Sequence, residues 1–115
     1  MGMDLLPGPS INRTGWQALY DLGVENRWVP AGTKPMRWDE TTFVPETDPK
    51  VIRRFSGSYF SNDYQEVSAE DARNWANALE RGLQELDSEA ESLRWVSMVA
   101  EFITFLRESA GFQIG

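Results

Sequence analysis

Few residues in this sequence could serve in catalysis or metal binding. Two residue types that commonly do so are absent, and their absence excludes several classes of site. The chain has no cysteine and no histidine. Without cysteine there is no disulfide, thiolate metal site or thiol nucleophile. Without histidine, the commonest metal ligand and the commonest general base are absent. Any catalysis would therefore depend on carboxylates, hydroxyls or arginines.

Acidic residues are the most numerous of these groups. Glu66 with Glu70, and Asp87 with Glu91, have the i, i+4 spacing that places two carboxylates on one helix face. Both pairs surround predicted helix starts, where the helix dipole favours negative charge without any catalytic role. Glu101 falls in the most apolar helical segment, either partly buried or on an exposed edge. We assign no catalytic, metal-binding or cofactor-binding residue and expect no cofactor and no enzyme activity.

Other polar clusters have ordinary explanations. Arg53 and Arg54 form the only adjacent basic pair, but no glycine-rich phosphate loop accompanies them. The oxygen-rich stretch 62–66 lacks the spacing of an EF-hand loop. We expect solvated charge in the first case and a self-bonded turn in the second.

Aromatic residues give the best candidate for a recognition surface. Trp28 and Trp38 lie among prolines and glycines, with little periodicity to bury them. Together with Tyr20 and Arg37 they could form an exposed aromatic patch. The alternative is that these side chains are structural.

Composition favours one globular domain. The chain has 115 residues, of which 41% are hydrophobic and 25% charged. The net charge is −7, and residues 58–115 carry all of it. A surface of that sign repels nucleic acid and would attract a basic protein partner, although acidity can also serve solubility alone. The sequence has no signal-peptide pattern and no stretch of about 20 apolar residues, so we expect a cytoplasmic protein without membrane contact.

The first half of the chain is broken by prolines, and its elements are short. Residues 1–9 read as a flexible lead-in to a single domain over 10–115. Asn12 is a plausible N-cap for a short helix that Gly23 would end. Residues 24–43 are equally compatible with short strands and with irregular loop. The residues after Asp48 are equally compatible with a helix and with a strand. Residues 58–61 and 64–67 read as a β-hairpin.

The second half predicts two helices. Ser68 opens a capping box, and apolar residues then recur at helical spacing over 69–86. A second capping box at 88–91 starts a helix over 89–110, which Gly111 would end in a left-handed conformation. Their short connection predicts an antiparallel helix hairpin.

We therefore predict an α+β fold, in which this hairpin packs on a small antiparallel β-element and a short N-terminal helix. The predicted core is drawn mainly from the two helices and comprises Trp75, Leu79, Leu83, Leu93, Val96, Val99, Ile103 and Leu106, with Tyr59 and Phe112.

The segment from Phe55 to Ala72 combines an aromatic–x–Gly–x–Tyr stretch, an Asn–Asp–x–Gln–x–Val turn and an Asp–Ala helix start. This pattern resembles that of a family of small uncharacterised bacterial proteins, and the end of the chain, 102–114, is similar to their C-termini. Tyr64 departs from the pattern, which has a small turn residue there. The resemblance covers the second half only. It implies a bacterial cytosolic source, brings no known activity and transfers no functional residue.

Three hypotheses for function follow. The first is an acidic protein-interaction module, comparable in size and charge with immunity or adaptor proteins. The second is a small-ligand binding domain that uses the aromatic patch. The third, which the sequence supports least, is a carboxylate-dependent enzyme.

Overall fold

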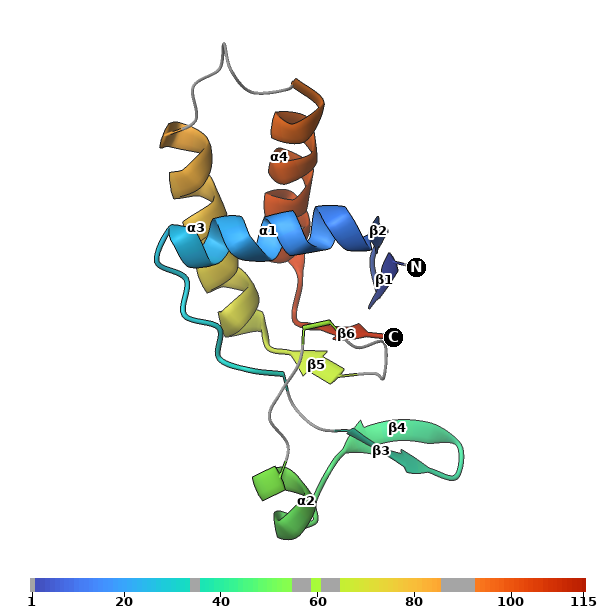
Figure 1. The fold of residues 1–115 in the computed structure, drawn as a ribbon. Coiled ribbons are helices and arrows are strands. Elements are labelled where there is room, and N and C mark those ends of the chain that lie inside the picture. The colour runs from blue at the N-terminus through green and yellow to red at the C-terminus, as the bar shows by residue number, and fades with distance from the viewer. Residues whose placement is uncertain (1, 34–35, 55–58, 61–64, 86–92) are drawn as a thin grey trace.

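Three helices and a small sheet form the body of the protein, from which a second, smaller set of elements protrudes (Figure 1). The structure is a computed structural model, and it describes residues 2–33, 36–54, 59–60, 65–85 and 93–115. The molecule measures 51 × 24 × 23 Å, with the helix pair toward one end and the protruding elements at the other.

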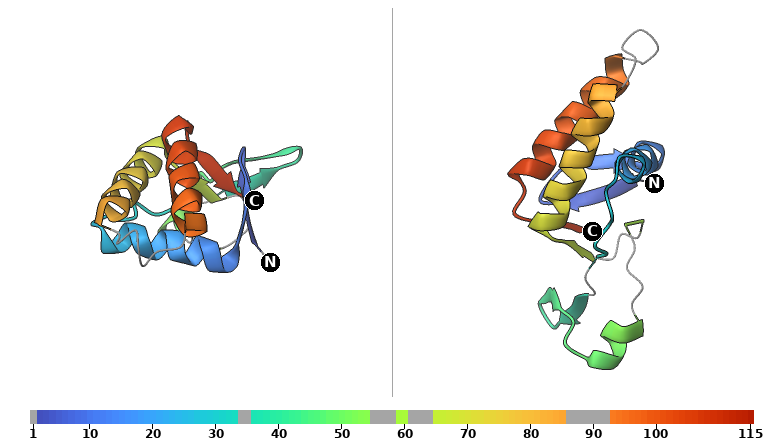
Figure 2. Two further views of the ribbon diagram at one scale, coloured as in Figure 1. Left: turned by 90° about the horizontal axis from the view of Figure 1, so that it is seen from above. Right: turned by 90° about the vertical axis from the view of Figure 1, so that its left-hand side faces the viewer.

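Helices α3 (Ala69–Glu85) and α4 (Leu93–Glu108) pack against each other as an antiparallel pair. This confirms the predicted helix hairpin, and the residues between the helices lie outside the described ranges, as does the predicted capping box at 88–91. Helix α1 (Arg13–Glu25) crosses the pair and packs mainly on α3 (Figure 2). None of the helices described in these ranges is long and apolar enough to cross a membrane.

The helix starts follow their predicted caps. The Asn12 side chain accepts a hydrogen bond from the Gly15 amide at 2.7 Å, and Ser68 Oγ accepts one from the Asp71 amide at 3.1 Å. The predicted end at Gly23 is wrong, because α1 continues to Glu25. Gly23 is instead a point of close packing on the body.

The sheet is four-stranded and antiparallel, in the order β2-β1-β6-β5. Its strands are β1 (Gly2–Leu6), β2 (Ser10–Asn12), β5 (Gln65–Val67) and β6 (Phe112–Ile114). The prediction that 1–9 is a flexible lead-in is therefore wrong: β1 is an inner strand, and Met3 and Leu5 are each 1% exposed. Its partner β6 lies at the other end of the chain, so local signals could not reveal the pairing.

The predicted hairpin over 58–67 is also wrong in its pairing. Its second strand exists as β5, but β5 pairs with β6, while Tyr59 and Phe60 lie in a turn. Residues 61–64 are outside the described ranges. Gly111, with φ 102°, leads the chain from α4 into β6, which confirms its predicted left-handed conformation.

The remaining elements come from the part of the sequence where alternatives were open. Residues 26–33 form an irregular segment, β3 (Met36–Asp39) and β4 (Thr42–Pro45) form an antiparallel hairpin, and α2 (Pro49–Arg54) follows as a short helix. The alternatives at Asp48 thus resolve in favour of helix.

Aromatic rings fill the centre of the core. Trp75 meets Trp16 edge-on at 5.2 Å between centroids and Phe102 at 4.9 Å. Both indole N–H groups are satisfied: Trp75 donates to the Leu19 carbonyl and Trp16 to the Tyr59 carbonyl.

Most predicted core residues are confirmed. The buried ones are Tyr59, Trp75, Leu79, Val99, Leu106 and Phe112. Three others are only partly buried, namely Leu83, Val96 and Ile103. The Leu93 side chain is not among those described. The prediction missed the core residues that the sheet supplies, which are Met3, Leu5, Val67 and Ile114.

Candidate functional site

The segment 36–54, which we call the arm, stands apart from the core. It contains β3, β4 and α2 and extends beyond the sheet (Figures 1 and 2). None of the arm residues whose side chains are described is buried. Trp38, Val51 and Ile52 are 57%, 43% and 44% exposed. A helix or hairpin in a globular protein normally covers its apolar side against another element, and the arm leaves these side chains open.

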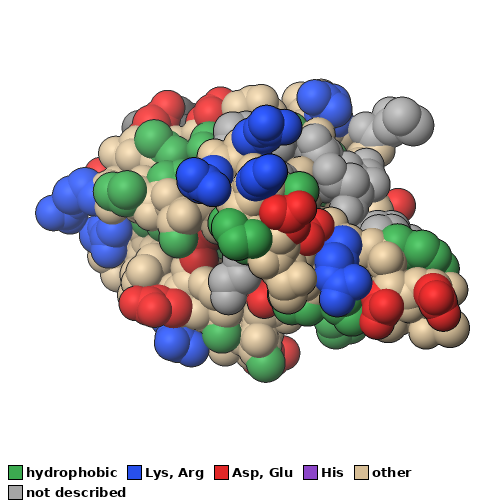
Figure 3. Space-filling model, turned by 90° about the horizontal axis from the view of Figure 1, so that it is seen from below, with side chains coloured by type: hydrophobic (Ala, Val, Ile, Leu, Met, Phe, Trp, Pro, Cys, Tyr) green, Lys and Arg blue, Asp and Glu red, His purple; other side chains and the backbone are tan. Residues whose placement is uncertain are grey.

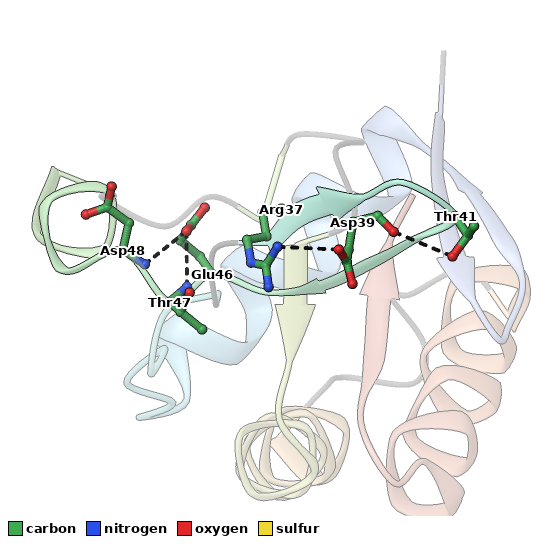
Figure 4. A network of polar contacts seen from close by, with 6 residues as sticks. All are labelled: Arg37, Asp39, Thr41, Glu46, Thr47 and Asp48. Carbon is green, nitrogen blue, oxygen red and sulfur yellow. Dashed lines mark hydrogen bonds and ion pairs between the residues drawn. The ribbon is translucent and has the colours of Figure 1, made fainter.

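Local hydrogen bonds shape the arm. The hairpin runs in register from Met36 opposite Pro45 to Asp39 opposite Thr42, and Glu40 at its turn has φ 55°. An ion pair joins Arg37 to Asp39 at 3.9 Å on the exposed strand (Figure 4). Such contacts shape the hairpin locally.

The start of α2 is held in the same local way. The Asp48 carboxylate accepts a hydrogen bond from the Lys50 amide at 2.9 Å, and Pro49 occupies the first helical position. Glu46 Oε1 accepts from the amides of Thr47 and Asp48 at 3.1 and 3.0 Å (Figure 4). The chain thus enters α2 through carboxylate caps.

Helix α2 carries a basic side next to an apolar one. Lys50, Arg53 and Arg54 are spaced i, i+3 and i+4, so they share one face of the helix, and all are exposed. Basic side chains gather on the lower face of the molecule, where α2 lies (Figure 3). Within the described ranges, these cations form no ion pair with a carboxylate. Val51 and Ile52 occupy the neighbouring part of the helix surface.

A buried carboxylate, that of Asp71, is hydrogen-bonded both to the chain before the arm and to the chain after it. Asp71, 2% exposed, accepts at Oδ1 from Trp28 Nε1 at 3.0 Å and from the Ala31 amide at 3.1 Å. At Oδ2 it accepts from the Tyr59 hydroxyl at 2.5 Å. That hydroxyl in turn accepts from the Gly32 amide at 2.9 Å. We call these five residues the clamp, since they tie the segments before and after the arm to the first turn of α3.

The clamp also perturbs one titratable group. Burial, and after it the hydrogen bond and negative charge of Asp71, raise the pKa of Tyr59 well above its ordinary range. The hydroxyl therefore keeps its proton in the folded protein and remains a donor to the carboxylate.

The predicted recognition residues fall into two separate groups. Trp28 is 2% exposed and stacks on Trp75 at 4.4 Å and 3° between planes, so the expectation that it is exposed is wrong. Tyr20 is partly buried and packs edge-on against Trp28 at 5.3 Å. Arg37 and Trp38 lie on β3 in the arm. Trp28 is buried because its indole N–H has a carboxylate acceptor and its ring has a tryptophan to stack on.

One signal for the clamp was present in the sequence. Asp71 occupies the capping-box position that usually holds glutamate. A glutamate there would reach back to the helix start, whereas the shorter side chain of Asp71 accepts from Trp28, Ala31 and Tyr59 instead. Trp28, Ala31 and Tyr59 lie 43, 40 and 12 positions before Asp71 in the chain. Residue spacing alone cannot indicate contacts over such separations.

The surface of the helix pair is mixed in charge rather than uniformly acidic. The described parts of α3 and α4 carry exposed glutamates at 70, 80, 85, 101 and 108, exposed arginines at 73, 94 and 107, and the partly buried Arg81. Arg107 pairs with Glu80, and both Nε and Nη2 of Arg81 donate to the Asn26 carbonyl. Glu101, whose burial the sequence left open, is exposed. No cluster of three or more His, Cys, Asp or Glu side chains suited to a metal ion occurs in the ranges that the structure describes.

Comparisons of the chain with protein-family models, with curated proteins and with solved structures find no match.

Proposed function

We propose that this protein is a protein-interaction module that contacts its partner through the arm. The observation that supports this most is the exposure of Trp38, Val51 and Ile52 on a segment of regular structure that buries none of its described side chains. A two-stranded hairpin and a six-residue helix are only marginally stable alone. Covering their apolar side chains with a partner would add the stability that the body does not supply.

The charge of α2 indicates what kind of partner surface the arm would contact. Lys50, Arg53 and Arg54 lie beside the exposed apolar pair Val51 and Ile52, so an acidic surface with an adjoining apolar area is the complement. The net charge of the whole chain suggested a basic partner instead, but the described helix surfaces are mixed in sign. The arm therefore favours an acidic contact surface.

The clamp supports the same proposal. Ala31, before the arm, and Tyr59, after it, are both bonded to the buried Asp71, so the chain on either side of the arm is anchored to the body. A pre-organised contact segment loses less conformational freedom on binding than a free one.

Affinity capture with matched variants tests the proposal. Val51→Ser/Ile52→Ser removes apolar surface from the arm, and Val24→Ser removes a valine of similar exposure (45%, against 43% for Val51) from α1. We expect the tagged protein and the Val24→Ser control to retain one stoichiometric protein from native extract, which the arm variant loses. Equal retention by all three forms, with unchanged melting temperatures, would exclude the arm as the contact surface.

A further inference from the structure

An apolar groove runs along α4, away from the arm. Its first part has a volume of about 380 Å³ and lies between α4 and the chain around β2. Ile11, Met98, Phe102 and Phe105 supply its apolar lining, and the exposed Glu101 stands at its edge. A concave apolar surface with one charged group at the rim is the form that ligand and peptide sites take.

The groove continues toward the end of α4. A second hollow of about 360 Å³ shares Phe105 with the first and is bordered by Pro7 and Glu108. Glu101 and Glu108 are two helical turns apart, which corresponds to about 10 Å along the axis. The two hollows share Phe105, and each has one glutamate in its lining.

Neither carboxylate has a cationic partner among the residues that the structure describes. In the ranges that the structure describes, no ion pair or side-chain hydrogen bond engages Glu101 or Glu108. Lys50, Arg53 and Arg54 of α2 are equally without an acidic partner there. The same chain therefore presents an acidic, apolar groove and a basic, apolar helix.

We propose that the groove binds α2 of a second copy of this chain. This inference rests on the proposed function, because it names the acidic surface that the arm contacts. Val51 and Ile52 would lie on the apolar floor, as an amphipathic helix lies in a groove, and the cations of α2 would meet Glu101 and Glu108.

The occupant must come from another molecule. Figures 1 and 2 both place α2 beyond the sheet, at the opposite end of the molecule from the body of α4. A helix so placed cannot fill its own groove. The contact joins two different surfaces, arm to groove, so the copies associate head to tail or exchange arms.

Charge reversal tests this contact. Arg53→Glu/Arg54→Glu makes the arm acidic, and Glu101→Lys/Glu108→Lys makes the groove basic. Sedimentation velocity at low salt should show association of the unaltered protein, and each variant alone should associate about tenfold or more weakly, because like charges then meet. In a mixture of the two variants, the arm of each is complementary to the groove of the other, so the mixture should associate again.

Two controls make the outcome specific. Arg73→Glu/Arg94→Glu changes the net charge as much as the arm variant does, at exposed positions outside arm and groove, and it should still associate. High salt should dissociate the complex. A monomer at all concentrations, or association that neither charge reversal weakens, overturns the inference. If the arm of such a monomeric chain still retains another protein in the capture experiment, the proposed function stands and only the second copy as partner is excluded.

Discussion

Replacing Tyr59 by phenylalanine removes one hydroxyl from the clamp and leaves the aromatic packing in place. The hydroxyl donates to Asp71 at 2.5 Å and accepts from the Gly32 amide at 2.9 Å, so two hydrogen bonds are lost. Asp71 then keeps only the donors Trp28 and Ala31, and one carboxylate oxygen loses the partner it has in the clamp.

The cost follows from these two bonds. A hydrogen bond to a buried charged group contributes about 1.5–3 kcal/mol, and the stranded Gly32 amide adds about 1 kcal/mol. We expect Tyr59→Phe to lower the free energy of unfolding by about 2–4 kcal/mol at neutral pH, measured by urea denaturation. Tyr20→Phe is the matched control, because it removes a hydroxyl from a tyrosine whose ring lies 5.5 Å from that of Tyr59. Among the described residues that hydroxyl has no hydrogen-bond partner, so we expect a change within about 0.5 kcal/mol.

The pH dependence gives a second readout. The pKa of Tyr59 is raised in the folded protein, so its contribution to stability is complete below the unfolded-state pKa, near 10. Above that pH the unfolded chain releases the proton while the folded protein keeps it. Stability then falls by about 1.4 kcal/mol for each pH unit. Tyr59→Phe should lack this part of the alkaline decline.

Two results would refute this reasoning. A cost of Tyr59→Phe below about 1 kcal/mol, or one equal to that of Tyr20→Phe, would mean that the clamp does not stabilise the fold. An alkaline decline of the same slope in the variant and in the unaltered protein would mean that Tyr59 titrates normally.

Three further predictions concern stability. Gly23→Ala should cost about 1–3 kcal/mol in chemical denaturation, because a Cβ there would meet Trp75 at 2.6 Å and Trp28 at 2.9 Å. Arg27 has φ 76°, a conformation that glycine adopts without strain. Arg27→Gly should therefore raise the free energy of unfolding by up to about 1 kcal/mol and raise the melting temperature with it. A lower melting temperature would contradict this. Ile52→Ser should change the free energy of unfolding by less than about 0.5 kcal/mol, because the side chain is 44% exposed in an arm that buries none of its described side chains; a cost above 1 kcal/mol would place Ile52 in the cooperative core.

The helices were predictable because their signals are local. Asn12 and Ser68 cap their helices through side-chain bonds to amides three residues later, and apolar spacing indicated the buried faces of α3 and α4. The sheet was not predictable in this way. Strand β1 pairs with β6 at the far end of the chain, and three-residue strands such as β5 carry too few residues for a pattern.

The candidate site was predicted only in part. Trp38 and Arg37 are on the arm, but Trp28 is buried by a stack and a hydrogen bond to residues more than 40 positions away. The residues after Asp48, which include Val51 and Ile52, were compatible with helix and with strand, and neither alternative indicates that these side chains are exposed. Their exposure depends on how the arm packs against the rest of the fold, which local spacing does not indicate.

Site-specific photo-crosslinking tests the central claim, that the arm is a protein-contact surface, most directly. A photoreactive residue at position 52 is compared with one at position 24, where the native Ile52 and Val24 are 44% and 45% exposed. We predict that position 52 crosslinks to one discrete protein, either another chain or a second copy of this one, and that position 24 does not. Crosslinking from both positions alike, or from neither, would contradict the account.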